Sequence, residues 1–219
     1  MSRVSPYRDS TQWLQSQRIR KTFESLQKRF FKVSVAQDGN EACEIIAGLV
    51  APQDLVAKGD SATLEEIGIV PYLRARGNRV TDPYEILEIV PNAQQLRETL
   101  CVDVFLTSAN AVTLHGDIVL VDGTGNRVSA TVFGPKKVII VLGQNKIVDT
   151  IEDGYRRVTS ICAPINRHKR GRTAPPCAQT GFCCDCHSQD RACRIYLTMS
   201  YRPRQSDITV ILVREDLGF

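Results

Sequence analysis

The chain has 219 residues, of which 42% are hydrophobic and 24% are charged, and its formal net charge is +4. This length suits one large domain that buries a hydrophobic core, so a metal is not needed to hold the whole fold together. The mild positive charge argues against a nucleic-acid-binding protein, which usually carries a strong basic stripe.

The first residues contain neither the apolar core nor the cleavage site of a secretory signal. No apolar run approaches the length that spans a membrane. We therefore expect a cytoplasmic protein with no membrane span, in a compartment where thiols stay reduced.

Helical and strand patterns alternate along the chain. Apolar residues at helical spacing predict a helix over residues 10–31, and Asp38 caps a second helix that ends before Pro52. A further helix follows residues 59–61, and a long one begins at Asp149 or Thr150 and runs to Ile165. Strands are predicted over residues 32–36, 54–58, 104–106, 118–121, 127–132, 138–142, 194–201 and 207–213. This order predicts one α/β domain over residues 1–219, with a mainly parallel sheet flanked by helices and some antiparallel strands.

Several loops between these elements carry small polar and basic residues. Residues 59–68 join a strand to a helix, where free backbone N–H groups bind anions, although a well-capped helix explains the same residues. Residues 107–113 follow a strand, where α/β folds bind ligands. Residues 122–127 contain two glycines between apolar segments, which predicts a hairpin turn. We take as candidate ligand-binding residues Ser61, Thr63, Asn110, Thr113, Asp122, Gly123, Thr124, Gly125, Asn126, Arg127, Lys136, Asn145 and Lys146.

A basic run covers residues 167–172, between the end of the long helix and the cysteine-rich segment. We interpret it as an exposed loop whose cations are favoured near a helix C-terminus, rather than as a contact with an anion. No aromatic residues alternate with these cations, as base stacking in a nucleic-acid site requires.

Five of the eight cysteines lie in residues 175–194, and four of them follow the pattern C-x5-C-x2-C-x6-C. A C-x2-C pair lets one tight turn direct two sulfurs to a common point, and thiolates bind soft metals. The segment therefore predicts a site for zinc or an iron–sulfur cluster, with reduced structural thiols as the alternative. The predicted metal ligands are Cys177, Cys183, Cys186 and Cys193.

The other cysteines are less informative. Cys184 is a spare ligand, a redox-active neighbour or a small buried residue. His187 could ligate the metal, but a residue next to a ligand more often points the other way, and we favour that interpretation. Cys43, Cys101 and Cys162 lie in apolar segments, so we expect them to pack in the core.

Taken together, these motifs resemble the LUD-domain (lactate-utilisation) family, in the branch that carries a C-terminal cysteine motif. The match rests on the cysteine pattern and on residues 59–68, 107–113, 122–127, 134–138 and 143–148. The resemblance implies a fold similar to the sugar-isomerase and CoA-transferase group. It also implies a role in oxidising L-lactate to pyruvate together with iron–sulfur partner subunits.

Three functions remain open at this point. The leading hypothesis is a redox subunit of lactate utilisation, with a four-cysteine metal site beside a crevice for a small anionic ligand. The second is an isomerase or a CoA/acyl-transferase-like enzyme in which Glu65 or Glu66 acts as base or nucleophile. The third is a non-catalytic regulatory or assembly subunit whose metal only fixes the cysteine-rich segment.

Overall fold

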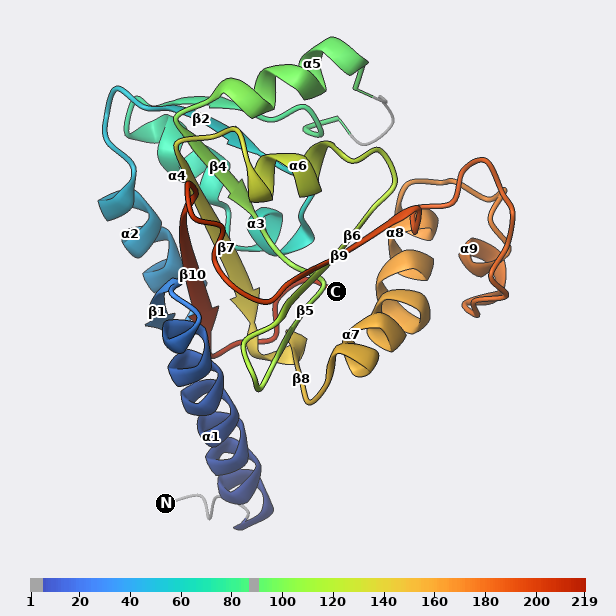
Figure 1. The fold of residues 1–219 in the computed structure, drawn as a ribbon, viewed down its shortest axis with the longest axis horizontal. Helices are drawn as coiled ribbons and strands as arrows, with labels where there is room; N and C mark the ends of the chain where they lie inside the picture. Colours follow the sequence, from blue (N-terminus) through green and yellow to red (C-terminus); the bar gives the residue numbers. More distant parts are fainter. Residues whose placement is uncertain (1–5, 87–90) are drawn as a thin grey trace.

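The structure is a computed structural model that describes residues 6–86 and 91–219. Its centre is a six-stranded sheet in which every pair of neighbouring strands is parallel (Figure 1). In spatial order the strands are β1 (Lys32–Ala36), β10 (Asp207–Val213), β7 (Lys137–Gly143), β4 (Val104–Thr107), β2 (Leu55–Lys58) and β3 (Arg79–Thr81). Their apolar runs are nearly continuous because both faces of the sheet are covered.

One face of this sheet packs on three helices, α2 (Gly39–Leu49), α3 (Ala62–Glu66) and α4 (Ile69–Ala75). Alternate residues of a strand point to opposite faces. Accordingly, Ile139 and Val141 of β7 join the cluster beneath these helices, whereas the residues between them face the other side.

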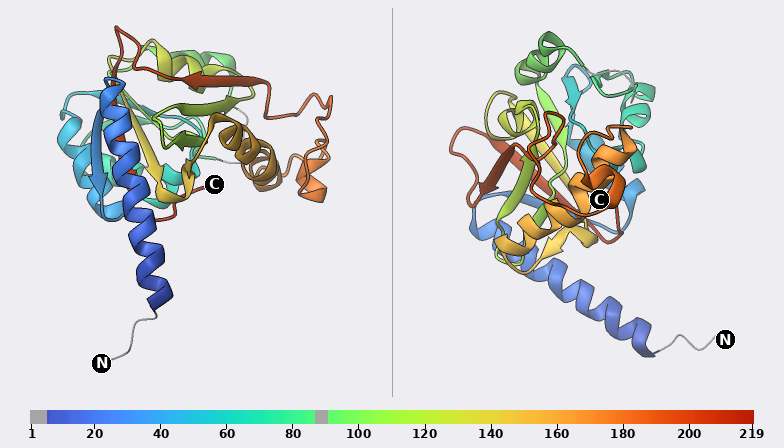
Figure 2. Two further views of the ribbon diagram at one scale, coloured as in Figure 1. Left: turned by 60° about the horizontal axis from the view of Figure 1, so that its bottom comes forward. Right: turned by 90° about the vertical axis from the view of Figure 1, so that its right-hand side faces the viewer.

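The opposite face packs on α1 (Pro6–Lys28), α6 (Asn126–Val132) and a second, four-stranded sheet. The N-terminal part of α1 extends beyond the body of the molecule (Figures 1 and 2). The second sheet has the order β8 (Ile147–Val148), β5 (Ala111–Thr113), β6 (Ile118–Asp122) and β9 (Ile195–Met199). Its pairs β5–β6 and β6–β9 are antiparallel.

The outer face of the second sheet is covered by α7 (Ile151–Arg157), which continues through a π-helical segment (Val158–Cys162) into α8 (Ala163–Lys169). The cysteine-rich segment begins with the short helix α9 (Cys177–Thr180) and returns to the sheet as β9 (Figure 1). Three short elements complete the fold, the helix α5 (Ala93–Glu98) and the 3₁₀ turns η1 (Thr99–Cys101) and η2 (Gln144–Lys146).

The predicted α/β class with a parallel sheet is confirmed, and so are the antiparallel additions. The strand predicted over residues 127–132 is wrong, because these residues form α6. Residues 122–127 are therefore a strand-to-helix connection and not a hairpin turn. Among the described residues, no helix combines the length and apolarity that crossing a bilayer demands.

Candidate functional site: a basic cavity beside a ring of thiols

A cavity of about 560 Å³ opens where the parallel strands end. Ser61 follows β2, residues 108–110 follow β4, and Lys146 follows β7, and all of them line it. The carboxyl ends of parallel strands meet at one edge of a sheet, and α/β proteins bind ligands there. We call this the main cavity.

The walls of the main cavity are strongly basic. Asp60, Asp122 and Asp190 are the acidic side chains of its lining. Against these three stand seven basic side chains, which are Arg127, Lys146, Arg167, Arg170, Arg172, Arg191 and Arg194. The excess of positive charge favours an anionic occupant.

Most of the predicted ligand residues lie in this wall. The sequence motifs that converge there come from four separate segments of the chain, residues 59–68, 107–113, 122–127 and 143–148. They supply Ser61, Asn110, Asp122, Gly123, Thr124, Asn126, Arg127 and Lys146.

The remaining predicted ligand residues lie outside the lining. Thr63 and Asn145 stand behind it, where Thr63 contacts Lys146 and the Asn145 amide donates to the Gly218 carbonyl at 3.0 Å. Thr113 serves its own turn, since its hydroxyl bonds to the Asp117 carboxylate at 3.1 Å. Gly125 precedes α6 with a φ of 101°.

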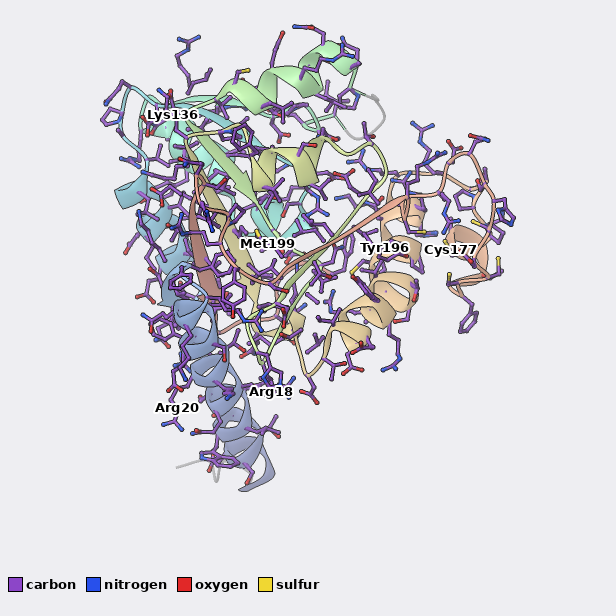
Figure 3. The ribbon with its side chains drawn as sticks, in the orientation of Figure 1. Arg18, Arg20, Lys136, Cys177, Tyr196 and Met199 are labelled. Atoms are coloured by element: carbon purple, nitrogen blue, oxygen red, sulfur yellow. The ribbon has the colours of Figure 1, made fainter. Side chains whose placement is uncertain are left out.

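Lys136 lies at the other edge of the sheet, because it precedes β7. Its side chain is 82% exposed and pairs with Asp103 at 2.7 Å. In Figure 3 it lies far from Cys177, which marks the cysteine-rich segment.

The two glutamates of the enzyme hypothesis are also outside the lining. Glu65 accepts hydrogen bonds from Lys169 at 3.0 Å and from Lys58 at 3.4 Å. Glu66 accepts from the Gly218 backbone N–H at 2.6 Å. Their contacts tie α3 to neighbouring segments, so no feature of the described residues presents either carboxylate to a bound substrate.

Two of the lining residues mainly build the wall. The Asp122 carboxylate accepts from the backbone N–H groups of Thr124, Arg127 and Val128 at 3.0, 3.0 and 3.1 Å, which stabilises the start of α6. The Arg127 guanidinium donates to the carbonyls of Ser108 and Val121 and to the Asn110 side chain, so it links β4, β6 and α6.

The basic run is placed differently from the prediction. Residues 167–169 form the last turn of α8, and Arg167, Arg170 and Arg172 line the main cavity instead of an exposed loop. Burial alone would raise the pKa of Asp60, but the neighbouring Arg170 and Lys169 outweigh it and hold that pKa below its usual range. The Arg172 side chain has no partner among residues 6–86 and 91–219, so its guanidinium is available to a ligand.

The Lys146 amine is buried in the floor of the main cavity, with 3% of the residue exposed. It donates to Thr63 Oγ1 at 2.7 Å and to Ser108 Oγ at 3.0 Å. Burial, and then the charge of Arg157, lower the pKa of Lys146 to about 7.

The five cysteines of the C-terminal segment line a second, much smaller cavity. We call this the thiol pocket, defined by Cys177, Cys183, Cys184, Cys186 and Cys193. Burial raises the pKa of Cys177, and the nearby Cys186, Cys193 and Cys183 raise it further. The four predicted ligands therefore line one pocket, and none of them is in a disulfide.

The sulfur donors of the thiol pocket lie farther apart than the ligands of a single metal ion do. Among the described residues, no group of three or more His, Cys, Asp or Glu side chains converges as one metal ion requires. Cys184 is exposed, which excludes its interpretation as a buried residue. His187 is exposed and does not contribute to the lining, as expected.

The other three cysteines are not all core residues. Cys43 and Cys162 are buried, as predicted, and Cys162 also lines the main cavity. Cys101 is exposed, so the prediction that it packs in the core is wrong, because it lies in η1 at the surface.

The main cavity and the thiol pocket share a wall made of Ala163, Arg167, Arg191 and Ala192. Arg191 bridges the two most directly. Its guanidinium donates to the Cys186 carbonyl at 2.7 Å and to Cys193 Sγ at 3.4 Å, and it also lines the main cavity.

Comparison with known proteins agrees with this architecture. The profile of the LUD domain family matches residues 19–213. The fold is similar to the crystal structure of a DUF162 family protein from Deinococcus radiodurans, with a TM-score of 0.51 and 14% identity over 91% of this chain and 98% of that one. A weaker likeness, with a TM-score of 0.39 and 14% identity, links 52% of this chain to 44% of eIF2B beta from Chaetomium thermophilum. No curated protein matches the chain.

Proposed function

Because the chain belongs to the LUD-domain family, which is associated with lactate utilisation, we propose that it is a redox subunit of L-lactate oxidation to pyruvate. In this proposal the main cavity binds the small carboxylate, and the thiol pocket holds a metal centre. Partner subunits that carry iron–sulfur clusters accept the electrons.

The observation that best supports this proposal is the wall shared by the main cavity and the thiol pocket. Arg167 and Arg191 face both cavities, and so do Ala163 and Ala192. A carboxylate in the main cavity would therefore lie one layer of side chains from the thiols. Oxidation of lactate releases two electrons and two protons, and this proximity gives the electrons a short path.

The thiol pocket suits a thiolate-bound centre. Its five sulfur donors favour zinc or an iron–sulfur cluster over hard cations. Among the described residues the thiols line one pocket without converging on a single point, so their geometry does not choose between zinc and a cluster. When bound, an iron–sulfur cluster supplies a one-electron relay, and N–H donors such as the backbone of Asp185, at 3.4 Å from Cys183 Sγ, tune its potential.

Metal analysis of cysteine variants tests this assignment. We expect the anaerobically purified chain to be coloured and to contain iron and inorganic sulfide. Serine at Cys177, Cys183, Cys186 or Cys193 should each remove most of the iron, because each thiolate is a ligand. Cys101→Ser, which changes an exposed thiol outside the pocket, is the matched control.

Three outcomes of that analysis separate the alternatives. If the Cys184→Ser variant retains its iron, Cys184 is not a ligand and the four predicted cysteines are the iron ligands. A colourless protein with one zinc per chain would eliminate the electron relay while keeping a metal site. A protein that binds neither metal when both are supplied anaerobically contradicts the whole assignment.

The carboxylate half of the proposal is tested at Arg172, whose guanidinium faces the main cavity without a partner among the described residues. Arg172→Ala should weaken binding of pyruvate and L-lactate about tenfold, as loss of one charge-assisted hydrogen bond implies. Isothermal titration calorimetry measures this, with Arg20→Ala on the exposed face of α1 (Figure 3) as the control. Equal affinities of the two variants would remove Arg172 from the site.

A further inference from the structure

The Lys146 amine is unlike the other cations of the main cavity. It is held at the carboxyl end of β7, at the end of the turn η2, and is almost completely buried by its surroundings. Gly218 packs against it so closely that a Cβ at that position would lie 3.2 Å from Nζ. No carboxylate forms an ion pair with Lys146 among the described residues, whereas the neighbouring cavity cation Arg170 pairs with Asp60.

Its hydrogen bonds match a neutral amine. An ammonium has three N–H donors, whereas a neutral amine has two donors and a lone pair. Lys146 Nζ has two acceptors, the hydroxyls of Thr63 and Ser108. Thr63 donates its own hydrogen to the Leu217 carbonyl at 3.2 Å, and Ser108 donates to the Ala109 carbonyl at 3.3 Å and to Thr63 Oγ1 at 3.4 Å. Both hydroxyls can accept from the amine, and the third position on Nζ has no partner among the described residues and is open to a ligand.

The electrostatic surroundings favour the same form. Burial of an ammonium is costly, and Arg157 and Arg127 add positive charge nearby; together they outweigh the opposite influence of Cys162 and Glu66 on the pKa of Lys146. The lowered pKa of Lys146 follows from these causes, and an amine that is neutral near physiological pH is a nucleophile.

From this arrangement we propose that Lys146 forms a Schiff base with a 2-oxo acid bound in the main cavity. The carboxylate of the acid pairs with the free guanidinium of Arg172, and the amine attacks the adjacent carbonyl carbon. The C–N bond forms as the carbonyl electron pair moves to oxygen. The two amine protons then leave with that oxygen as water, which gives the C=N bond, and no oxidant or reductant is consumed. The proposal rests on the anion-binding half of the proposed function and is independent of the metal centre.

Reductive trapping of the full chain tests it. The protein is incubated at neutral pH with pyruvate and sodium cyanoborohydride, which reduces the C=N bond, and the labelled lysine is located by peptide mass mapping. We expect Lys146 to carry the reduced pyruvate adduct at a level at least about tenfold above Lys136, because an exposed lysine stays protonated at this pH. Lys146→Met should abolish the adduct while its circular dichroism spectrum remains that of the parent chain.

The outcomes are distinguishable from those of the proposed function. Labelling confined to exposed lysines, with pyruvate still binding by calorimetry, overturns the covalent step and leaves the anion site in place. Absence of both binding and labelling overturns the two together. The trapping is repeated on protein stripped of metal by a chelator. The same labelling in both samples would show that the covalent step does not depend on a metal centre.

Discussion

Burial of the Lys146 amine without a carboxylate makes the stability of the folded chain depend on pH in one direction. In the unfolded chain this amine titrates near its usual pKa of 10.5, and in the folded chain near 7. Between these values unfolding takes up a proton, so rising pH stabilises the folded state. Below pH 7 the amine is protonated in both states, and the full cost of burying the charge remains.

Lys146→Met removes this dependence. The free energy of unfolding of the parent chain should rise relative to the variant by about 1.4 kcal/mol for each pH unit above 7. Urea unfolding at a series of pH values between about 7 and 9 measures the difference. Lys136→Met is the control, because Lys136 is exposed and its pKa is raised by Asp103, so it stays charged throughout this range. Parallel curves for the parent and Lys146→Met would contradict a neutral amine.

For single residues, the sequence predicted where functional side chains lie better than it predicted what they do. The spacing of the cysteines placed the thiols in one pocket, because C-x2-C limits how far two sulfurs can separate. Lys146 was predicted as a cation that neutralises a ligand, since nothing in its local sequence shows that it is buried. Its partners Thr63 and Ser108 are 83 and 38 residues away, and only the fold brings them together.

Among the elements, α6 shows where pattern analysis fails. Its residues alternate as a strand does, and the glycines before it are typical of hairpins, yet they form a helix. The Asp122 side chain favours the helix by accepting two N–H groups of its first turn, although the N-cap residue itself is Gly125. Asp122 was interpreted from the sequence as a ligand-binding residue.

Asp122→Ala should therefore destabilise the fold by about 1–2 kcal/mol, because the carboxylate that caps the N–H groups of Arg127 and Val128 is lost. Thermal or urea unfolding measures this loss, and Glu24→Ala, at an exposed carboxylate of α1, should change stability little. An Asp122→Ala variant as stable as the parent would show that the cap is not needed for α6.

The basic run over residues 167–172 also shows a limit of prediction from sequence. Its charge was evident from the sequence, but its direction depends on how α8 packs beside the loop that carries Asp60. Cations at the C-terminus of a helix are stabilised by the helix dipole whether they face solvent or a cavity, so the sequence does not distinguish the two. The α/β order, in contrast, was predictable because buried parallel strands are apolar along their whole length.

For the molecule as a whole, the parallel sheet and its flanking helices follow from the alternation of elements, whereas the junction of the two cavities does not. That junction needs the chain to cross from α8 through the cysteine-rich segment to β9, which returns antiparallel to β6. Ala163, Arg167, Arg191 and Ala192 then form one partition between the main cavity and the thiol pocket. The proposed redox function depends on this partition.

The electron paramagnetic resonance spectrum of the anaerobically reduced chain, recorded with and without saturating pyruvate, tests the partition most directly. We expect the signal of a reduced iron–sulfur centre, and we expect pyruvate to shift it, because the anion lies against the side chains of Arg167 and Arg191 that also contact the thiol pocket. A signal that pyruvate leaves unchanged, or a chain reconstituted with iron and sulfide that gives no signal, would contradict a metal centre beside the anion site.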